Sequence, residues 1–177
     1  MKPLAFMLLA GEASGDLLAA ELVRALRVQV AAWQAQPTDN AQPLRTNLEP
    51  QFFGAGRQQM AAAGVEIAVD MTPFAVVGFS DPVKQFLPLR RAFHRLLRLA
   101  IERQPDVVLG VDYGGFNLRF ASAIKRQVRA RIGSFNNWNP RLVQYVSPQV
   151  WASREGRADR MEPVSYTHLT LPTKRIV

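Results

Sequence analysis

An apolar run at residues 4–10 passes directly into the hexapeptide Gly11–Asp16, which contains two glycines, two carboxylates and a hydroxyl. An unbroken apolar run of this length indicates a buried parallel strand, and Ser14 and Asp16 are residue types that favour the start of a helix. Open α/β folds bind their ligands at such strand-to-helix junctions. The hexapeptide therefore predicts both an α/β fold and the place of a binding site.

The rest of the chain repeats the alternation of strand-like and helix-like segments. The strand-like segments are residues 4–10, 51–54, 65–69, 106–111 and 142–146. The first helix-like segment begins at residue 14, and three others cover residues 57–63, 88–103 and 117–128. This alternation predicts a Rossmann-like parallel sheet with helices on both faces. If the first three strands wind one way and the fourth returns beside the first, the strand order is 3-2-1-4-5.

Charge and composition narrow the classes of function. The chain of 177 residues has 22 Lys and Arg against 14 Asp and Glu, for a formal net charge of +8. Positive charge suits phosphorylated substrates or anionic lipid, but no basic stretch is interleaved with stacking aromatics, so nucleic acid is not expected as a partner. Two distant histidines and the absence of cysteine give no metal-ligand pattern. No stretch reaches the roughly 20 apolar residues of a membrane span.

In the predicted strand order, the loops after the first, fourth and fifth strands lie side by side. The first loop is a poor phosphate site, because Glu12 and Asp16 would repel an anion and the glycine spacing does not fit a dinucleotide fingerprint. Carboxylates accept hydrogen bonds from hydroxyls, so a neutral polyol such as a sugar suits this loop better. The alternative is purely structural, with Ser14 as a helix cap and Asp16 as a partner of the helix dipole.

Asp112 ends the fourth predicted strand and lies in a glycine-rich loop. A carboxylate in this position is a candidate general base for a hydroxyl, and equally a candidate loop or helix cap. Asn117 could cap the following helix or hold substrate.

The helix expected at residues 88–103 carries apolar residues on one side and several arginines on the other. Together with Phe79, Phe86 and Leu87, its residues Arg90 and Arg91 form a surface that could rest on anionic lipid. An ordinary solvated, charged face is the alternative.

Three motifs resemble those of the bacterial lipid-A-disaccharide synthases: GEASGD at residues 11–16, GVDYGGFN at 110–117 and YVSPQVWASR at 145–154. FGAG at 53–56 and AVVGF at 75–79 resemble intermediate landmarks in the same order. The resemblance runs from residue 4 to about residue 161. It implies that residues 1–161 form the N-terminal, acceptor-side domain of a two-domain glycosyltransferase B-type fold.

The resemblance also implies an inverting transfer from UDP-2,3-diacylglucosamine to 2,3-diacylglucosamine 1-phosphate, without a metal or organic cofactor. The enzyme would lie in the cytoplasm, on the cytoplasmic face of the inner membrane. Asp112 matches the family's essential aspartate, the proposed base for the acceptor 6-hydroxyl. The expected substrate contacts are Gly11, Glu12, Ser14, Gly15, Asn117 and Ser147. The expected membrane contacts are Phe79, Phe86, Leu87, Arg90 and Arg91.

The chain also departs from the family pattern. A glycine pair at 114–115 replaces a second acidic residue in the Asp112 loop, and residues 34–50 and 133–141 look like insertions. From the family resemblance we expect a UDP-binding second domain to be missing, and therefore expect the fragment alone to be inactive. Residues 162–177 resemble translated sequencing-adapter read-through and are expected to be unstructured.

Two other interpretations of the function are a glycosyltransferase of the same fold with a soluble acceptor and a non-catalytic nucleotide-binding module. Nothing in the sequence indicates an oligomeric state.

Overall fold

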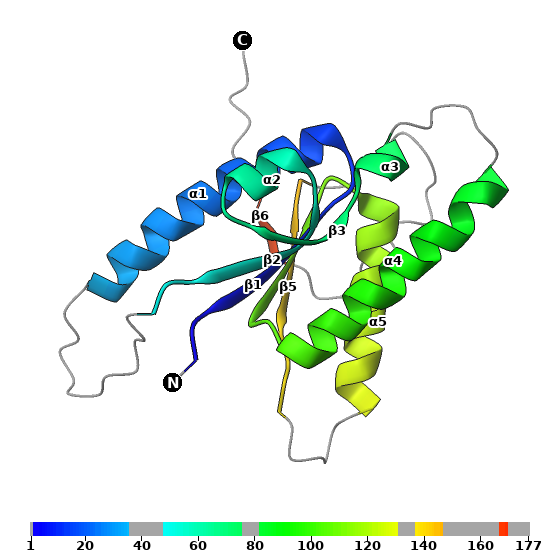
Figure 1. The fold of residues 1–177 in the computed structure, drawn as a ribbon. Coiled ribbons are helices and arrows are strands. Elements are labelled where there is room, and N and C mark those ends of the chain that lie inside the picture. The colour runs from blue at the N-terminus through cyan, green and yellow to red at the C-terminus, as the bar shows by residue number, and fades with distance from the viewer. Residues whose placement is uncertain (1, 36–47, 76–81, 131–136, 147–166, 170–177) are drawn as a thin grey trace, which may run out of the picture.

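The computed structural model describes residues 2–35, 48–75, 82–130, 137–146 and 167–169 (Figure 1). Its strands are β1 (Ala5–Ala10), β2 (Gln51–Gly56), β3 (Glu66–Asp70), β4 (Val107–Val111), β5 (Arg141–Tyr145) and β6 (Thr167–Leu169). They form one sheet in the order β3-β2-β1-β4-β5-β6, and every neighbouring pair is parallel. The order of the first five strands confirms the predicted order 3-2-1-4-5.

The helices are α1 (Ala13–Ala35), α2 (Gln58–Ala62), α3 (Thr72–Ala75), α4 (Pro82–Arg103) and α5 (Gly114–Ala130). Figure 1 shows α1 and α2 on one face of the sheet and α4 and α5 on the other. This arrangement confirms the α/β class with helices on both faces.

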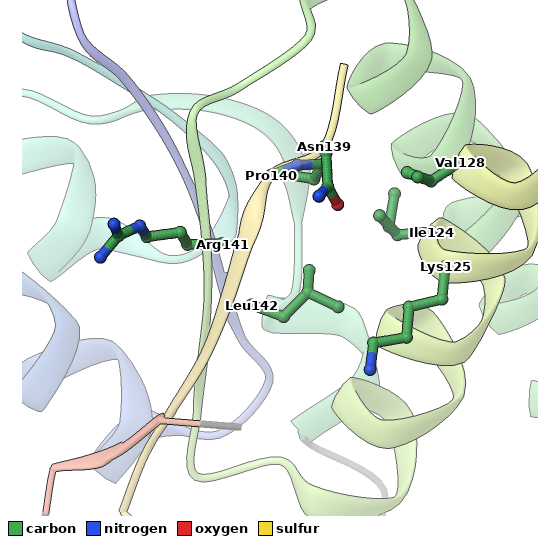
Figure 2. A pocket seen from close by; sticks show the side chains of 7 residues that line it. All are labelled: Ile124, Lys125, Val128, Asn139, Pro140, Arg141 and Leu142. Atoms are coloured by element: carbon green, nitrogen blue, oxygen red, sulfur yellow. The ribbon is translucent and has the colours of Figure 1, made fainter. Parts of the chain in front are cut away.

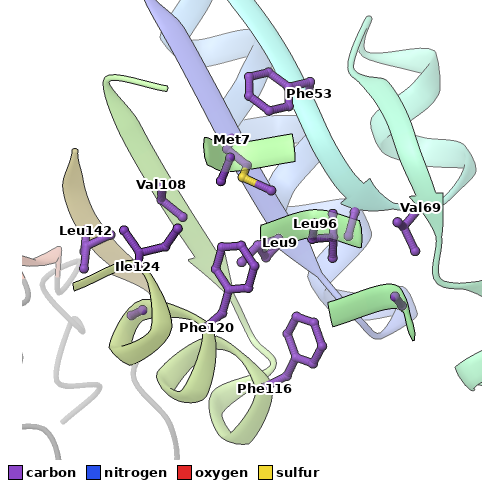
Figure 3. Packing of buried hydrophobic residues seen from close by; sticks show 14 of the residues in the cluster. Met7, Leu9, Phe53, Val69, Leu96, Val108, Phe116, Phe120, Ile124 and Leu142 are labelled. Atoms are coloured by element: carbon purple, nitrogen blue, oxygen red, sulfur yellow. The ribbon is translucent and has the colours of Figure 1, made fainter. Parts of the chain in front are cut away.

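β1 lies at the centre of the sheet, and all six of its residues are buried. Its alternate side chains enter two different cores, because successive residues of a strand point to opposite faces. Met7 and Leu9 pack with α4 and α5 (Figure 3), whereas Phe6 and Leu8 pack with α1 and α2. Burial on both sides explains why this segment is apolar without alternation.

Two helices begin earlier than the sequence predicts. α4 starts at Pro82 rather than near Pro88, so the first-turn proline is Pro82 and Pro88 lies inside the helix. α5 starts at Gly114 rather than Asn117. Its first turn is closed by the Tyr113 carbonyl, which accepts the N–H groups of Phe116 and Asn117 at 3.1 and 2.9 Å. Glycines are poor helix formers, which hid this start from the sequence pattern.

The segment expected to be unstructured at 162–177 contributes three residues to the sheet. Thr167–Leu169 form β6 and pair with Val143–Tyr145 of β5. At these residues the structure differs from the expectation that the tail packs nowhere in the fold. The other residues of that segment lie outside the described part of the chain, as do residues 36–47 and 133–136 of the two expected insertions.

Candidate functional site

The loops after β1 and β4 meet at the carboxyl edge of the sheet. β1 and β4 are paired up to Ala10 and Val111, so the two loops leave the sheet at the same level. Ser14 Oγ donates a hydrogen bond of 2.9 Å to Asp112 Oδ2, although the two residues are 98 positions apart. This contact confirms that the loops after the first and fourth strands are neighbours. The loop after the fifth strand, with Ser147, lies outside the described residues.

Asp112 is held in an unusual backbone conformation at the end of β4. Its φ of 44° lies in the left-handed region, which aspartate and asparagine tolerate better than most residues. Its N–H donates to the Tyr145 carbonyl of β5 at 3.4 Å. Within the described part of the chain, no hydrogen bond occupies the second carboxylate oxygen, Oδ1. Asp112 therefore has one oxygen held by Ser14 and one oxygen without a hydrogen-bond partner among the described residues.

Ser14 was expected either to cap its helix or to contact substrate. α1 begins at Ala13, so Ser14 lies inside the first turn and is not the cap. Its hydroxyl is used instead to orient the Asp112 carboxylate. The local signal for a cap was misleading because the hydroxyl bonds across the sheet edge rather than to its own helix.

Asp16 has a structural role that the sequence did not predict. Its side chain is only 2 % exposed. It accepts backbone N–H groups from Arg57, Gln59 and Met60 at 2.7, 2.9 and 3.4 Å. Arg57, the residue before α2, makes no capping bond with its own side chain, so Asp16 caps α2 from α1. Its carboxylate is thus committed to the fold and is not open to a sugar hydroxyl.

The two glycines of the first loop allow the fourth loop to approach. A Cβ at Gly11 would lie 2.5 Å from Cδ1 of Tyr113. A Cβ at Gly15 would lie 3.3 Å from the Val111 carbonyl and 3.5 Å from the Asp112 Cβ. Both glycines are therefore explained by packing, and their contact with substrate stays a prediction.

Glu12 is the exposed acid of the first loop. Partial burial raises the pKa of Tyr113, and the nearby charge of Glu12 raises this pKa further. The Glu12 carboxylate thus lies close enough to the Tyr113 hydroxyl for its charge to influence the pKa of that hydroxyl. The carboxylate itself is open to solvent. Tyr113 was not identified from the sequence as a candidate site residue. Its position between Asp112 and two glycines was the one signal that could have indicated it.

Asn117 is buried rather than open to the edge of the sheet. It is 3 % exposed, and Gln144 of β5 is 2 % exposed. Both Asn117 amide atoms and Gln144 Oε1 lack a hydrogen-bond partner within the described residues. They line a cavity of about 10 Å³, close to the space that one water needs. A Cβ at Gly110 would come within 2.6 Å of Gln144 Oε1, so this glycine makes room for both amides.

The expected membrane contacts of α4 lie on its exposed surface. Phe86 and Leu87 are 61 % and 58 % exposed, and Arg90 and Arg91 are also exposed. Phe79 lies outside the described residues. Among the described helices, none is long and apolar enough to cross a membrane.

Another concave region lies away from Asp112. A hollow of about 350 Å³ lies between α5 and the start of β5 (Figure 2), at the edge of the sheet opposite Asp112. Within the described ranges, no cluster of three or more His, Asp or Glu side chains could hold a metal ion. The Ser14–Asp112 pair is therefore the candidate site at the carboxyl edge of the sheet, where open α/β folds bind their ligands.

Comparison with known proteins identifies the family of this chain. A sequence model of the lipid-A-disaccharide synthetase family matches residues 6–172. The chain belongs to this family. The match extends past residue 161, where we expected the likeness to end. The five-stranded parallel core agrees with the N-terminal half of the family's glycosyltransferase fold.

Curated lipid-A-disaccharide synthases are identical to this chain at about a third of the aligned positions. The Trichlorobacter lovleyi protein is 34 % identical over 91 % of the chain and 35 % of its own length. The Coxiella burnetii protein is 34 % identical over 88 % and 34 %, and the Koribacter versatilis protein 36 % identical over 84 % and 32 %. The chain thus spans about a third of the length of the relatives it matches.

Proposed function

We propose that this chain forms the acceptor-sugar side of a lipid-A-disaccharide synthase, with Asp112 as the general base. The observation that carries the proposal is the Ser14–Asp112 hydrogen bond, which fixes one carboxylate oxygen at the ligand-binding edge and leaves the other uncommitted. Family membership and the names of the curated relatives supply the reaction class.

In this proposal the acceptor is 2,3-diacylglucosamine 1-phosphate and the donor is UDP-2,3-diacylglucosamine. Oδ1 of Asp112 takes the proton of the acceptor 6-hydroxyl as that oxygen attacks the anomeric carbon of the donor. The bond from this carbon to the UDP oxygen breaks, UDP leaves with the electron pair, and the configuration inverts. Glu12, exposed beside Tyr113, accepts hydrogen bonds from the sugar hydroxyls. Ser14 keeps the base oriented.

Departing UDP carries negative charge that must be stabilised by positive groups or N–H donors. In this proposal the donor side of the site lies in the part of the relatives that this chain does not match. We therefore expect residues 1–177 alone to form no disaccharide from the two substrates.

A chimeric protein tests this proposal. It joins residues 1–146 to the part of the Coxiella burnetii relative that follows the strand corresponding to β5. We expect this chimera to release UDP and form the disaccharide, whereas residues 1–177 alone do neither. A folded chimera that binds the UDP donor but transfers no sugar would contradict the proposal. So would robust transfer by residues 1–177 alone.

We also propose that the exposed surface of α4 rests on the cytoplasmic face of the inner membrane. Replacing Leu87 by serine and Arg91 by glutamine removes one large apolar and one cationic contact. An arginine near an anionic surface contributes about 1 kcal/mol, and a buried leucine contributes more. The affinity for phosphatidylglycerol vesicles, measured by co-sedimentation, should therefore fall by about tenfold or more.

The matched control is the pair Val28→Ser and Arg24→Gln on α1, on the other face of the sheet. Val28 is 66 % exposed, so the control also removes one exposed apolar and one exposed basic side chain. Equal losses for the two double variants would show that vesicle binding follows overall charge and hydrophobicity rather than the α4 surface.

A further inference from the structure

A pocket of about 500 Å³ lies between α4 and α5, next to the Asp112 loop. Its volume is within the range of small-molecule sites. The apolar wall comes from Phe86, Leu89 and Phe93 of α4, from Phe116 of α5 and from the ring of Tyr113. Tyr113 directly follows Asp112, so the pocket and the proposed base share one loop.

The aromatic wall of this pocket is pre-formed. Phe93 and Phe116 meet edge to face with ring centroids 5.5 Å apart, and Tyr113 stacks on Phe116 at 5.5 Å. Phe116 is buried and belongs to the core cluster shown in Figure 3. Because these rings are fixed by the core, a ligand chain could enter the pocket without reorganising the wall.

Two arginines add positive charge to this apolar pocket. Arg90 of α4 and Arg119 of α5 both line it, and both are exposed. In the described part of the chain, neither guanidinium forms an ion pair with a carboxylate. A pocket that joins an apolar wall to two uncompensated cations is complementary to an aliphatic chain attached to an anionic group.

We propose that this pocket binds the aliphatic chain of a phosphorylated lipid, with the phosphate at Arg90 and Arg119. The chain would lie against Phe93 and Tyr113. The inference rests on the proposed function only in identifying this lipid with the acylated acceptor of Asp112. The binding itself can be measured without any sugar transfer.

Gly115 provides a direct way to close the pocket. It lines the pocket, and a Cβ built there meets no heavy atom within 4 Å. A tryptophan at this position can therefore occupy the space without a clash in the fold. Gly115→Ala is the matched control, because it leaves nearly all of the space open and suits the first turn of a helix.

The probe is decyl phosphate, titrated calorimetrically into the 177-residue chain below the concentration at which it forms micelles. Decyl glucoside has the chain without the charge, and inorganic phosphate has the charge without the chain. We expect decyl phosphate to bind at least about tenfold more tightly than either. Gly115→Trp should weaken its binding by about tenfold or more, whereas Gly115→Ala should bind like the wild type.

A second variant tests the charged end of the pocket and does not depend on Gly115. The double variant Arg90→Gln and Arg119→Gln should lose the preference for decyl phosphate over decyl glucoside and keep the wild-type circular dichroism spectrum. Unchanged binding of decyl phosphate in both this variant and Gly115→Trp would overturn the proposal. Equal binding of inorganic phosphate by the wild type would instead indicate a free-phosphate site and would also overturn it. Loss of transfer in the chimera while decyl phosphate still binds would count against the proposed reaction and not against the pocket.

Discussion

Replacing Asp112 by asparagine in the chimeric transferase should lower the turnover number by about 10² to 10⁴-fold, the usual contribution of a general base. The substitution removes the basic oxygen and little else. Asparagine also tolerates the left-handed backbone at φ 44°, and its amide oxygen can still accept the Ser14 hydroxyl hydrogen bond. The free energy of unfolding should therefore change by less than about 0.5 kcal/mol.

The matched control for this substitution is Asp106→Asn, at the opposite end of β4. The Asp106 carboxylate accepts the Ala5 N–H at 2.9 Å and pairs with Lys2 at 3.2 Å, far from the carboxyl edge. This control should leave turnover close to the wild-type value. Wild-type turnover in Asp112→Asn would show that Asp112 is not the base. A large loss of stability in that variant would show that the residue acts as a structural cap.

Gly54→Ala should have the largest effect on stability, with a loss of more than about 4 kcal/mol or failure to fold. Gly54 has φ 150°, and a Cβ there would lie only 2.0 Å from the Leu8 carbonyl oxygen. Leu8 is its register partner on β1, so the clash involves the backbone of the central strand and cannot be relieved by a side-chain rotation. β1 and β2 would have to separate, and the two cores that meet at β1 would open.

Urea unfolding followed by circular dichroism measures this effect, with Gly115→Ala as the control. Gly115 meets open space, so alanine there should be neutral or stabilising by up to about 1 kcal/mol. Similar unfolding midpoints for Gly54→Ala and the wild type would contradict the close approach of β1 and β2.

The sheet order could be predicted because it depends on local patterns and on general rules of chain connection. Apolar runs mark the strands, intervening helices make the pairs parallel, and crossover rules limit the possible orders. The contact between Ser14 and Asp112 follows from this order, since β1 and β4 are neighbours. Residues that are far apart in sequence but lie at the ends of adjacent strands are thus accessible to sequence reasoning.

The roles of individual polar side chains were harder to predict. Asp16 caps α2, and its first partner, Arg57, is 41 residues away. Asn117 faces a buried space with Gln144, which only the packing of α5 against β4 and β5 determines. In both cases a local pattern favoured a cap or a ligand contact, and the tertiary neighbour decided the outcome.

Two landmarks of the family resemblance have a structural explanation. Gly54 lies in FGAG, where β2 approaches the backbone of β1. Gly110 lies in GVDYGGFN, where it makes room for the amides of Asn117 and Gln144. A glycine in a recognised motif is therefore not by itself a sign of ligand contact.

In the proposed reaction, the loops after β1 and β4 form the acceptor site. Backbone amide chemical shifts of the 177-residue chain, titrated with a short-chain 2,3-diacylglucosamine 1-phosphate, test this claim directly. We expect saturable shifts centred on residues 11–16 and 112–117 that diminish in Asp112→Asn. Shifts confined to the hollow between α5 and β5, or saturable binding that leaves both loops unchanged, would contradict it.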